Sequence, residues 1–239
     1  MDNVLERLWR VHLGSEPTPG IMLAAVSGYG RGELFPHSDI DILFLLKEQP
    51  TEAIENAISM VLRSLWDLGL QVGQSVRRLD ECARLAKRDL TIFTTMLEIR
   101  PIAGDASLIP ALETELSADN MWDSKTFYSA KLEEMQTRHA KFANTEYNLE
   151  PNVKNSPGGL RDIQVIGWMA LRHYGVPLDN LDKDDFLTPE EQQMLRDGRH
   201  FIGQVRFALH LLSGREEDRL LFDSQRSLAE LWGMNDGNT

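Results

Sequence analysis

The sequence predicts an α/β domain over residues 1–106, followed by a mainly helical domain over residues 107–239. Two observations support this division. In the first 105 residues, apolar runs of strand length alternate with stretches of helical period. Beyond about residue 107 the sequence is polar and favours helices. The chain has 239 residues, of which 42% are apolar, enough for the packed core of one large domain or two modest ones.

The elements of the first domain follow from the spacing of its apolar residues and from the residues that interrupt it. Apolar positions at steps of three and four are typical of an amphipathic helix, and short continuous apolar runs are typical of buried strands. In chain order we first expect a helix over 3–13, a loop over 14–20, a strand over 21–28, and a turn that opens into a short helix over 29–34. A strand over 40–46 and a helix over 51–68 that ends near Gly69 should follow. The domain should end with a strand over 70–79, a helix over 90–99 with Asp89 as its N-cap, and a short strand or turn over 100–105.

The second domain is expected to consist mainly of helices. Residues 107–147 are polar and favour helices, whereas NLEPNVKNSPGGL over 148–160 contains two prolines and two adjacent glycines and predicts a loop. Helical patterns resume over 161–175, 188–212 and 226–232. The charged run REEDR over 215–219 is interpreted as a solvated turn.

Composition excludes several classes of protein. The formal charge of −12 and the pI near 5.0 argue against nucleic-acid binding over a broad basic face. Cys82 is the only cysteine, which allows neither an intrachain disulfide nor a cysteine cluster for zinc, and a semi-buried apolar role is expected. The N-terminal sequence is not that of a signal peptide, and no window approaches ~18 uninterrupted apolar residues. We therefore expect a cytoplasmic protein that binds neither nucleic acid nor membranes.

Two aspartates interrupt the segment VSGYGRGELFPHSDIDILFLL, residues 26–46, at the start of an apolar run. Side chains alternate along a strand, so Asp39 and Asp41 are expected on one face, with Cα atoms about 6.5 to 7 Å apart. Two neighbouring carboxylates repel each other, and a cation between them relieves the repulsion. Hard oxygen ligands at this spacing suit Mg²⁺.

The glycine-rich turn before this pair predicts a phosphate site. Ser27, Gly28 and Gly30 lie where a strand passes into a turn, and residues without bulk let backbone N–H groups approach a phosphate. Ser38 can add a hydroxyl donor. Together, the turn and the acidic pair Asp39 and Asp41 predict metal-assisted phosphoryl-group chemistry on a nucleotide triphosphate. Each element alone has a structural alternative, because a D-x-D at a strand start is often a solvated edge or cap.

These residues resemble the nucleotidyltransferase superfamily of polymerase-β type, in which a small-residue turn precedes an acidic pair on the next strand. Three segments, SGYGRGELFPHSDIDILFL, YNLEPNVKNSPGGLRDIQVIGWMA and RFALHLLSGREEDRLLFDSQ, are similar to the bifunctional uridylyltransferase and uridylyl-removing enzymes that modify the nitrogen-signalling protein PII. The resemblance covers nearly the whole chain. It implies transfer of UMP from UTP to a tyrosine of PII, with Mg²⁺ required and pyrophosphate released.

The resemblance also implies roles for individual residues. Asp39 and Asp41 would hold the metal, Ser27 and Gly28 would cradle the triphosphate, and Ser38 would support it. The turn reads Ser27-Gly28 where the family usually has two glycines.

Superfamily members often add a third carboxylate on a later strand, where this sequence has Gln74. Of the nearby acidic residues, Glu98 is a better candidate for this third metal ligand than Asp80. The alternative is that Glu98 forms an ordinary salt bridge with Arg100 or another base.

Other basic residues are candidates for nucleotide binding. Lys154 and Arg161 flank the Pro-Gly-Gly turn of NVKNSPGGLRD as possible phosphate clamps, and a related stretch occurs in the glutamine-synthetase adenylyltransferases. The alternative is that this loop only joins two helices. Arg31 can meet the triphosphate or pair with a carboxylate. The six histidines show no metal-ligand spacing, and His37 is expected to be solvated in a loop.

The full enzymes of the family continue into a phosphohydrolase domain with His-Asp pairs and into two regulatory domains that sense glutamine. This sequence contains no His-Asp dipeptide, so uridylyl removal and glutamine sensing are not expected in these residues. We expect either a fragment whose helical domain is truncated or a natural short transferase. Two alternatives to a uridylyltransferase stay open at this point: adenylyl transfer to a protein, and a module that binds a nucleotide or PII without catalysis.

Overall fold

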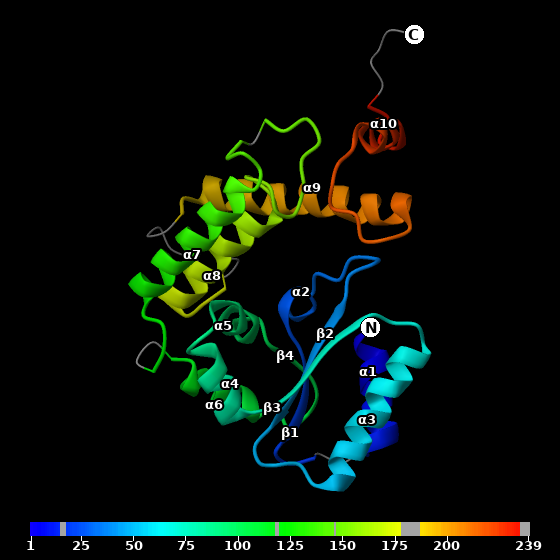
Figure 1. Ribbon diagram of the computed structural model, residues 1–239, viewed down its shortest axis with the longest axis vertical. Coiled ribbons are helices and arrows are strands. Elements are labelled where there is room, and N and C mark those ends of the chain that lie inside the picture. The colour runs from blue at the N-terminus through cyan, green and yellow to red at the C-terminus, as the bar shows by residue number, and fades with distance from the viewer. Residues whose placement is uncertain (15–17, 118–119, 146, 178–186, 235–239) are drawn as a thin grey trace. The chain divides into compact units, whose positions relative to one another are not determined.

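In the computed structural model, the chain is described over residues 1–14, 18–117, 120–145, 147–177 and 187–234 (Figure 1). The chain forms two compact units. The first comprises Met1–Leu34 and Ser38–Asp123, and the second comprises Phe35–His37 and Ser124–Thr239. A three-residue segment of the loop after the glycine turn thus belongs to the second unit, while the chain on both sides of it belongs to the first.

The first unit is a mixed α/β structure built on a four-stranded sheet. Its elements in chain order are α1 (Asp2–Leu13), β1 (Ile21–Ala25), α2 (Ser27–Gly30), β2 (Ile40–Leu46), α3 (Glu52–Asp67), β3 (Val72–Arg78), α4 (Leu79–Ala86), α5 (Leu90–Leu97), β4 (Arg100–Gly104) and α6 (Leu108–Glu115). The strand predicted over 40–46 and the helix predicted over 51–68 are confirmed. Asp89 caps α5 as predicted, because its carboxylate accepts hydrogen bonds from the backbone N–H groups of Thr91 and Ile92.

The sheet is small and mixed, with the strand order β3-β2-β1-β4. β1 runs antiparallel to β2, with Ala25 opposite Ile42, and antiparallel to β4, with Ala25 opposite Arg100. β2 and β3 are parallel, and Asp41 lies opposite Gly73. The carboxyl end of β1 therefore lies at the same end of the sheet as the amino ends of β2, β3 and β4.

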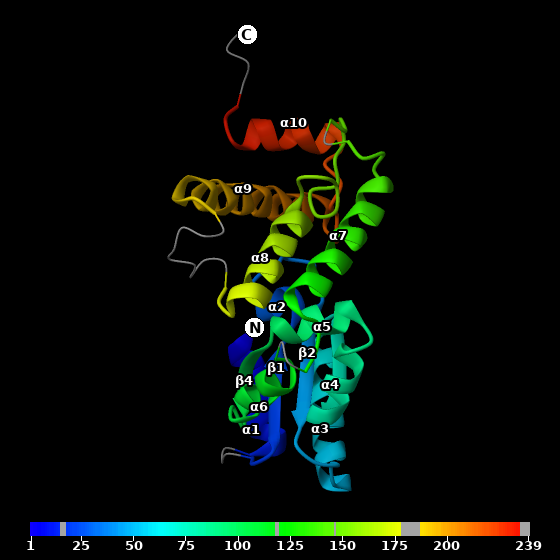
Figure 2. The same ribbon diagram turned by 90° about the vertical axis from the view of Figure 1, so that its left-hand side faces the viewer.

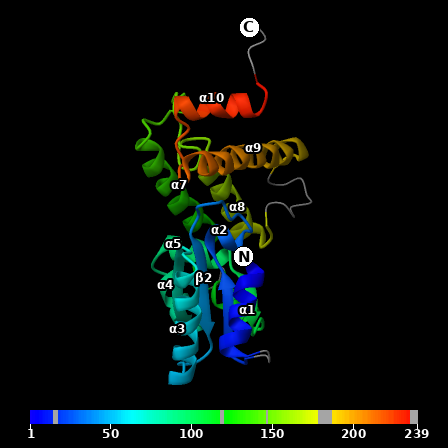
Figure 3. The same ribbon diagram turned by 90° about the vertical axis from the view of Figure 1, so that its right-hand side faces the viewer.

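Helices cover both faces of this sheet (Figure 1). On one face, buried side chains of α1 and α3 meet the even-numbered residues of β2 from Ile40 to Leu46. Figure 3 views the unit from the side on which these two helices lie. α4, α5 and α6 lie on the other side (Figure 2), and α4 contacts β3. Because β2 is buried on both faces from Ile42 to Leu46, its apolar run is continuous rather than alternating.

Three element assignments and the expected burial of Cys82 need correction in this unit. The strand expected over 21–28 ends at Ala25, because Ser27 adopts a left-handed backbone with φ 53° and begins α2. The helix expected over 29–34 correspondingly begins earlier and ends at Gly30. α4 was not predicted, although its two buried residues, Cys82 and Ala86, lie four positions apart, as on one face of a helix. Cys82 is fully buried rather than semi-buried, and this burial raises the pKa of its thiol to about 12.

The division between the units lies later than the boundary expected between residues 106 and 107. α6 contacts α4 and buries Leu108 and Leu112, so it belongs to the first unit. The indole N–H of Trp122 donates a hydrogen bond of 2.9 Å to the carbonyl oxygen of Ala86, which ties the end of this segment to α4. The polar composition of residues 107–123 conceals these few buried contacts.

The second unit contains helices α7 (Ser124–Ala140), α8 (Leu160–Tyr174), α9 (Pro189–Ser213) and α10 (Phe222–Leu231). Each contacts the next in chain order (Figure 2). α8 ends at Gly175 in the left-handed conformation, and α9 begins with a reciprocal capping box between Thr188 and Glu191. Within the described ranges, no helix combines the length and the apolar character needed to cross a membrane.

The glycine turn is fixed to the first helix by three polar side chains. The Tyr29 hydroxyl donates to Oδ1 of Asp2 at 2.6 Å, and Nη1 of Arg100 donates to Oδ2 of Asp2 at 2.7 Å. The Arg100 guanidinium also lies 5.4 Å from the centroid of the Tyr29 ring. The hydrogen bond from Arg100, and next that from Tyr29, lowers the pKa of Asp2 from 3.8 to about 2. One carboxylate thereby joins α1, α2 and β4.

We expect Asp2→Asn to destabilise the protein at neutral pH and to have a smaller effect in acid. The folded-state pKa of Asp2 is depressed, so its stabilisation is complete above about pH 4 and is lost as the pH falls towards 2. Because the carboxylate is partly exposed, solvent screening limits the loss at neutral pH to about 1 kcal/mol. Urea unfolding of both proteins at pH 6 and pH 2.5 measures this difference. An equal difference at both pH values would contradict the assignment.

Candidate active site

Asp39 and Asp41 lie on one face at the amino end of β2. Ile40 and Ile42 are only 3% and 1% exposed and point into the core, so the alternation of the strand turns the two aspartates the other way. Asp39 immediately precedes β2 and is exposed, whereas Asp41 lies within the strand and is half-buried. This is the arrangement that the sequence predicted for the pair.

A glycine on the neighbouring strand makes room for Asp41. A Cβ atom at Gly73 would lie 2.2 Å from Oδ1 of Asp41, so the Asp41 carboxylate would have to move to admit it. The carboxylate therefore occupies the space that a side chain on β3 would fill. Sequence reasoning missed this residue, although an isolated glycine within the strand pattern LQVGQSVRRL is a known signal of close approach by another group.

The glycine turn begins directly beside the acidic pair. The backbone N–H of Val26 donates a hydrogen bond of 3.0 Å to the carbonyl oxygen of Asp41, and Ser27 follows as the first residue of α2. Ser27 has φ 53°, a conformation that costs a residue with a side chain about 1 to 2 kcal/mol and glycine almost nothing. This conformation explains why glycine would suit the position that serine occupies here.

The two glycines of α2 differ in how closely other atoms approach them. A Cβ atom at Gly30 would lie 1.9 Å from the carbonyl oxygen of Glu98, so Gly30 is needed for packing. A Cβ atom at Gly28 would meet only the carbonyl oxygen of Glu33 at 3.4 Å and a guanidinium nitrogen of Arg31 at 3.5 Å, which are ordinary contacts. The fold therefore does not require glycine at position 28. First-turn amides of a helix have no acceptor within the helix, so those of α2 can serve an anion.

Arg31 pairs with carboxylates. Its guanidinium donates to Glu33 at 2.8 Å and to Glu98 at 2.5 Å. Burial alone would lower the pKa of Arg31, but Glu98 and Glu33 raise it above its ordinary value. The salt-bridge alternative for Glu98 is therefore realised with Arg31, while Arg100 pairs with Asp2. A role of Glu98 as a third metal ligand stays a prediction.

The donor set suits a hard divalent cation. In the part of the chain that the structure describes, no group of three or more His, Cys, Asp and Glu residues could hold a metal ion. Asp39 and Asp41 provide two carboxylates on one strand face, and the gap at Gly73 leaves room for the Asp41 side chain. Two carboxylates completed by the oxygens of a bound triphosphate are a typical coordination of Mg²⁺ in nucleotide-dependent enzymes. The residues present thus fit the metal that the sequence implied.

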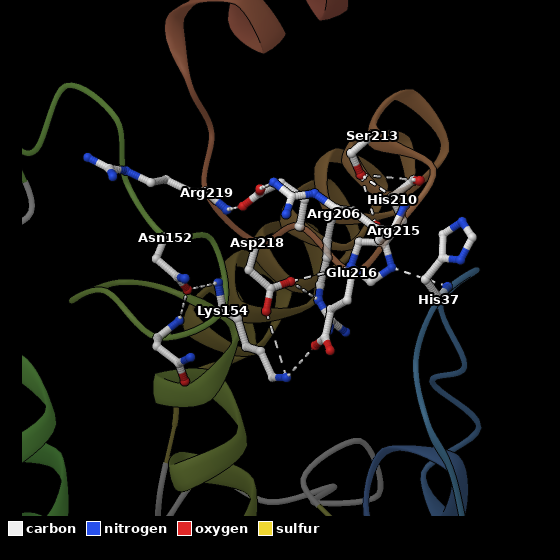
Figure 4. A network of polar contacts seen from close by, with 12 residues as sticks. His37, Asn152, Lys154, Arg206, His210, Ser213, Arg215, Glu216, Asp218 and Arg219 are labelled. Carbon is white, nitrogen blue, oxygen red and sulfur yellow. Dashed lines mark hydrogen bonds and ion pairs between the residues drawn. The ribbon is translucent and has the colours of Figure 1, made fainter. Parts of the chain in front are cut away.

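Lys154 and Arg161 belong to the second unit. The Lys154 ammonium lies 3.2 Å from Glu216 and 3.7 Å from Asp218 (Figure 4), and the Arg161 guanidinium lies 5.4 Å from the centroid of the Trp168 ring. Their expected role as phosphate clamps stays a prediction.

The loop that carries Lys154 and Arg161 folds back on itself. The N–H of Arg161 donates to the carbonyl oxygen of Lys154 at 2.8 Å. A Cβ atom at Gly159 would lie 2.9 Å from the carbonyl oxygens of Val153 and Lys154. The second glycine of the Pro-Gly-Gly turn is therefore required by this close approach of two backbone segments.

The charged run over 215–219 is not simply a solvated turn. Asp218 is largely buried and accepts a hydrogen bond of 2.6 Å from Nε of Arg206, whose side chain is only 7% exposed. Burial tends to raise the pKa of Asp218, but Arg206 and Lys154 lower it below its ordinary value. The error arose because Arg206, on α9, is distant from the run in sequence. These buried charges are the second feature that sequence reasoning missed.

Comparison with known proteins shows which enzymes the chain is similar to. Residues 126–239 match the family described as GlnD PII-uridylyltransferase. Over 239 residues the chain is 51% identical to the bifunctional uridylyltransferase/uridylyl-removing enzyme of Pseudomonas putida (strain W619), and it is 50% identical to the enzyme of that name from Pseudomonas aeruginosa (strain LESB58). Over its whole length the chain is similar to these bifunctional uridylyltransferase/uridylyl-removing enzymes.

The two sequence matches cover the whole of this chain but only part of each relative. Both include 100% of this chain but 26% of the relative, so the chain spans about a quarter of the length of these enzymes. Among solved structures, a toxin–antitoxin crystal structure with AMP-PNP aligns with 60% of this chain and 96% of that chain, at 13% identity and a TM-score of 0.32. A likeness at that level supports no inference.

Alanine substitutions should separate the two glycines of α2. Gly28→Ala should change the free energy of unfolding by less than about 1 kcal/mol, because the added methyl group makes only ordinary contacts. Gly30→Ala should cost about 3 kcal/mol or prevent folding, because its methyl group would overlap the Glu98 carbonyl. Urea unfolding followed by circular dichroism measures both. Equal stabilities of the two variants would refute this geometry.

Proposed function

We propose that this chain is the transferase part of such an enzyme and transfers UMP from UTP to a tyrosine hydroxyl of a PII protein, with release of pyrophosphate. The observation that carries the proposal is the shared face of Asp39 and Asp41, directly beside a turn that the Val26–Asp41 hydrogen bond holds in place. The uridylyl group and the PII acceptor come from the names of the relatives and of the family. With UTP and PII as its substrates, the proposed reaction would take place in the cytoplasm.

In this proposal the residues of the first unit orient the nucleotide. Asp39 and Asp41 would hold Mg²⁺, which when bound neutralises charge on the triphosphate and on the departing pyrophosphate. The first-turn amides of α2 at Ser27 and Gly28 would donate to phosphate oxygens, and the Ser38 hydroxyl would add a further donor. Most of the catalytic effect would come from positioning and charge neutralisation.

The bond changes of the transfer are simple. The tyrosine oxygen forms a bond to the α-phosphorus, the bond between the α-phosphorus and the bridging oxygen breaks, and the phenolic proton is lost to solvent.

Arg31 would act indirectly, because its pairing with Glu98 connects α2 to the end of α5. We further propose that the first unit is a polymerase-β-type nucleotidyltransferase domain and that α7–α10 form the helical domain that follows it.

We expect Asp39→Asn and Asp41→Asn each to lower the rate of UMP transfer by at least about 10³-fold, because either change removes one of two charges that hold the metal. Both substitutions preserve shape, so the melting temperature should stay within about 3 °C. The measurement is incorporation of labelled UMP into a purified PII protein at fixed Mg²⁺ concentration. Glu48→Gln, an equivalent change just beyond the other end of β2, is the matched control and should retain the rate.

The same assay distinguishes this function from its competitors. Label transferred from ATP but not from UTP would replace uridylyl transfer with adenylyl transfer. Binding of UTP with Mg²⁺ but no modification of PII at high enzyme concentration would indicate a binding module. Normal transfer by either aspartate variant would end the metal assignment.

A further inference from the structure

The loop between α2 and β2 carries a three-residue segment that is held apart from its neighbours in sequence. Phe35–His37 belongs to the second unit, whereas Leu34 and Ser38 on either side belong to the first. The segment ends two residues before Asp39. Whatever holds Phe35–His37 therefore also limits where Ser38 and Asp39 can lie.

Two buried residues of α9 hold this segment. The Arg206 guanidinium lies 4.3 Å from the centroid of the Phe35 ring, within cation–π range. The backbone N–H of His37 donates to Nδ1 of His210 at 3.4 Å (Figure 4), and the Phe35 and His210 ring centroids are 6.1 Å apart. Arg206 and His210 are 6% and 0% exposed, so the side chains that hold the segment are removed from solvent.

The holding residues are themselves fixed by acidic side chains. Asp218 accepts from Nε of Arg206 at 2.6 Å and lies 3.4 Å from Nε2 of His210, and Glu216 lies 3.2 Å from Nη2 of Arg206. Burial and the charge of Arg206 lower the pKa of His210, which favours the neutral ring. A neutral ring that accepts at Nδ1 carries its proton at Nε2 and can donate it to Asp218. The hydrogen-bonding roles of His210 are therefore mutually consistent.

We propose that Arg206 and His210 are positioning residues for the acidic pair: by anchoring Phe35 and the backbone of His37, they set the position of Ser38 and Asp39. This inference rests on the proposed function for its catalytic consequence, but the anchoring itself does not. Two residues of extended chain span at most about 7 Å, so a shift of the His37 backbone passes almost directly to Asp39. A displacement of about 1 Å at a metal-holding carboxylate is enough to reduce catalysis greatly.

Two pairs of variants test whether Arg206 and His210 hold the segment Phe35–His37. His210→Leu removes the acceptor of the His37 N–H, while His210→Asn keeps an acceptor near the position of Nδ1. Phe35→Leu removes the aromatic ring from Arg206, while Phe35→Tyr retains it. Phe35 is only partly buried, so substitutions there should preserve the fold. If His210→Leu does not fold, Phe35→Leu and Phe35→Tyr still test whether the segment Phe35–His37 is held in place.

The first readout needs no catalysis. Hydrogen exchange at the amide of His37, which donates to His210, should accelerate by about tenfold or more in both leucine variants, while β1 keeps its protection. The affinity for Mn²⁺ in the presence of UTP should fall by about fivefold or more in the same variants. His210→Asn and Phe35→Tyr should recover most of both properties.

The second readout is transfer itself. The kcat for UMP transfer should fall by about tenfold or more in the leucine variants, with a smaller change in KM for UTP and rescue by the conservative substitutions. Accelerated exchange with unchanged Mn²⁺ affinity and unchanged kcat would show a purely structural loop and overturn the proposal, as would unchanged exchange. If the unmodified chain transfers no UMP, the proposed function fails. Hydrogen exchange and Mn²⁺ affinity still decide whether Arg206 and His210 position Ser38 and Asp39.

Discussion

The candidate site is arranged around one close approach, that of the Asp41 carboxylate to Gly73. β2 is a strand buried on both faces for most of its length, and such a strand accepts a carboxylate only where its neighbour leaves room. Asp41 occupies that room, and its carbonyl oxygen also receives the N–H of Val26. One residue thereby contributes a carboxylate to the site and a backbone acceptor to the turn. The proposed metal and phosphate subsites are adjacent because they share Asp41.

A second constraint is electrostatic. Arg206 and Lys154 approach the same carboxylate, that of Asp218, from two different segments, and His210 lies beside it (Figure 4). The segment at Phe35 and His37 joins this cluster through Arg206 and His210. The three sequence motifs that resemble the family are widely separated along the chain, yet each contributes to this one network. Their shared occurrence therefore has a physical reason besides nucleotide binding.

Local signals determined how much could be predicted from the sequence. β2 was predicted with correct bounds because it is an apolar run of strand length, and α9 was predicted from its helical pattern over 188–212. The shared face of the two aspartates follows from strand alternation alone. The left-handed backbone of Ser27 leaves no trace in the sequence, so the strand before it was predicted too long. Ion pairs between distant segments could not be predicted from the sequence either, because no local pattern specifies them. Examples are the pairs of Glu98 with Arg31 and of Asp218 with Arg206.

Locating a bound divalent ion is the most direct test of a site shared by the metal and the triphosphate. Mn²⁺ broadens the NMR signals of nearby amides, and in the presence of UTP we predict the strongest broadening at Gly28 and Gly73, which flank the acidic pair. Gly104, at the opposite end of the sheet, should be affected least. Broadening that is strongest at Gly104, or that spares both Gly28 and Gly73, would contradict a shared site for the metal and the triphosphate.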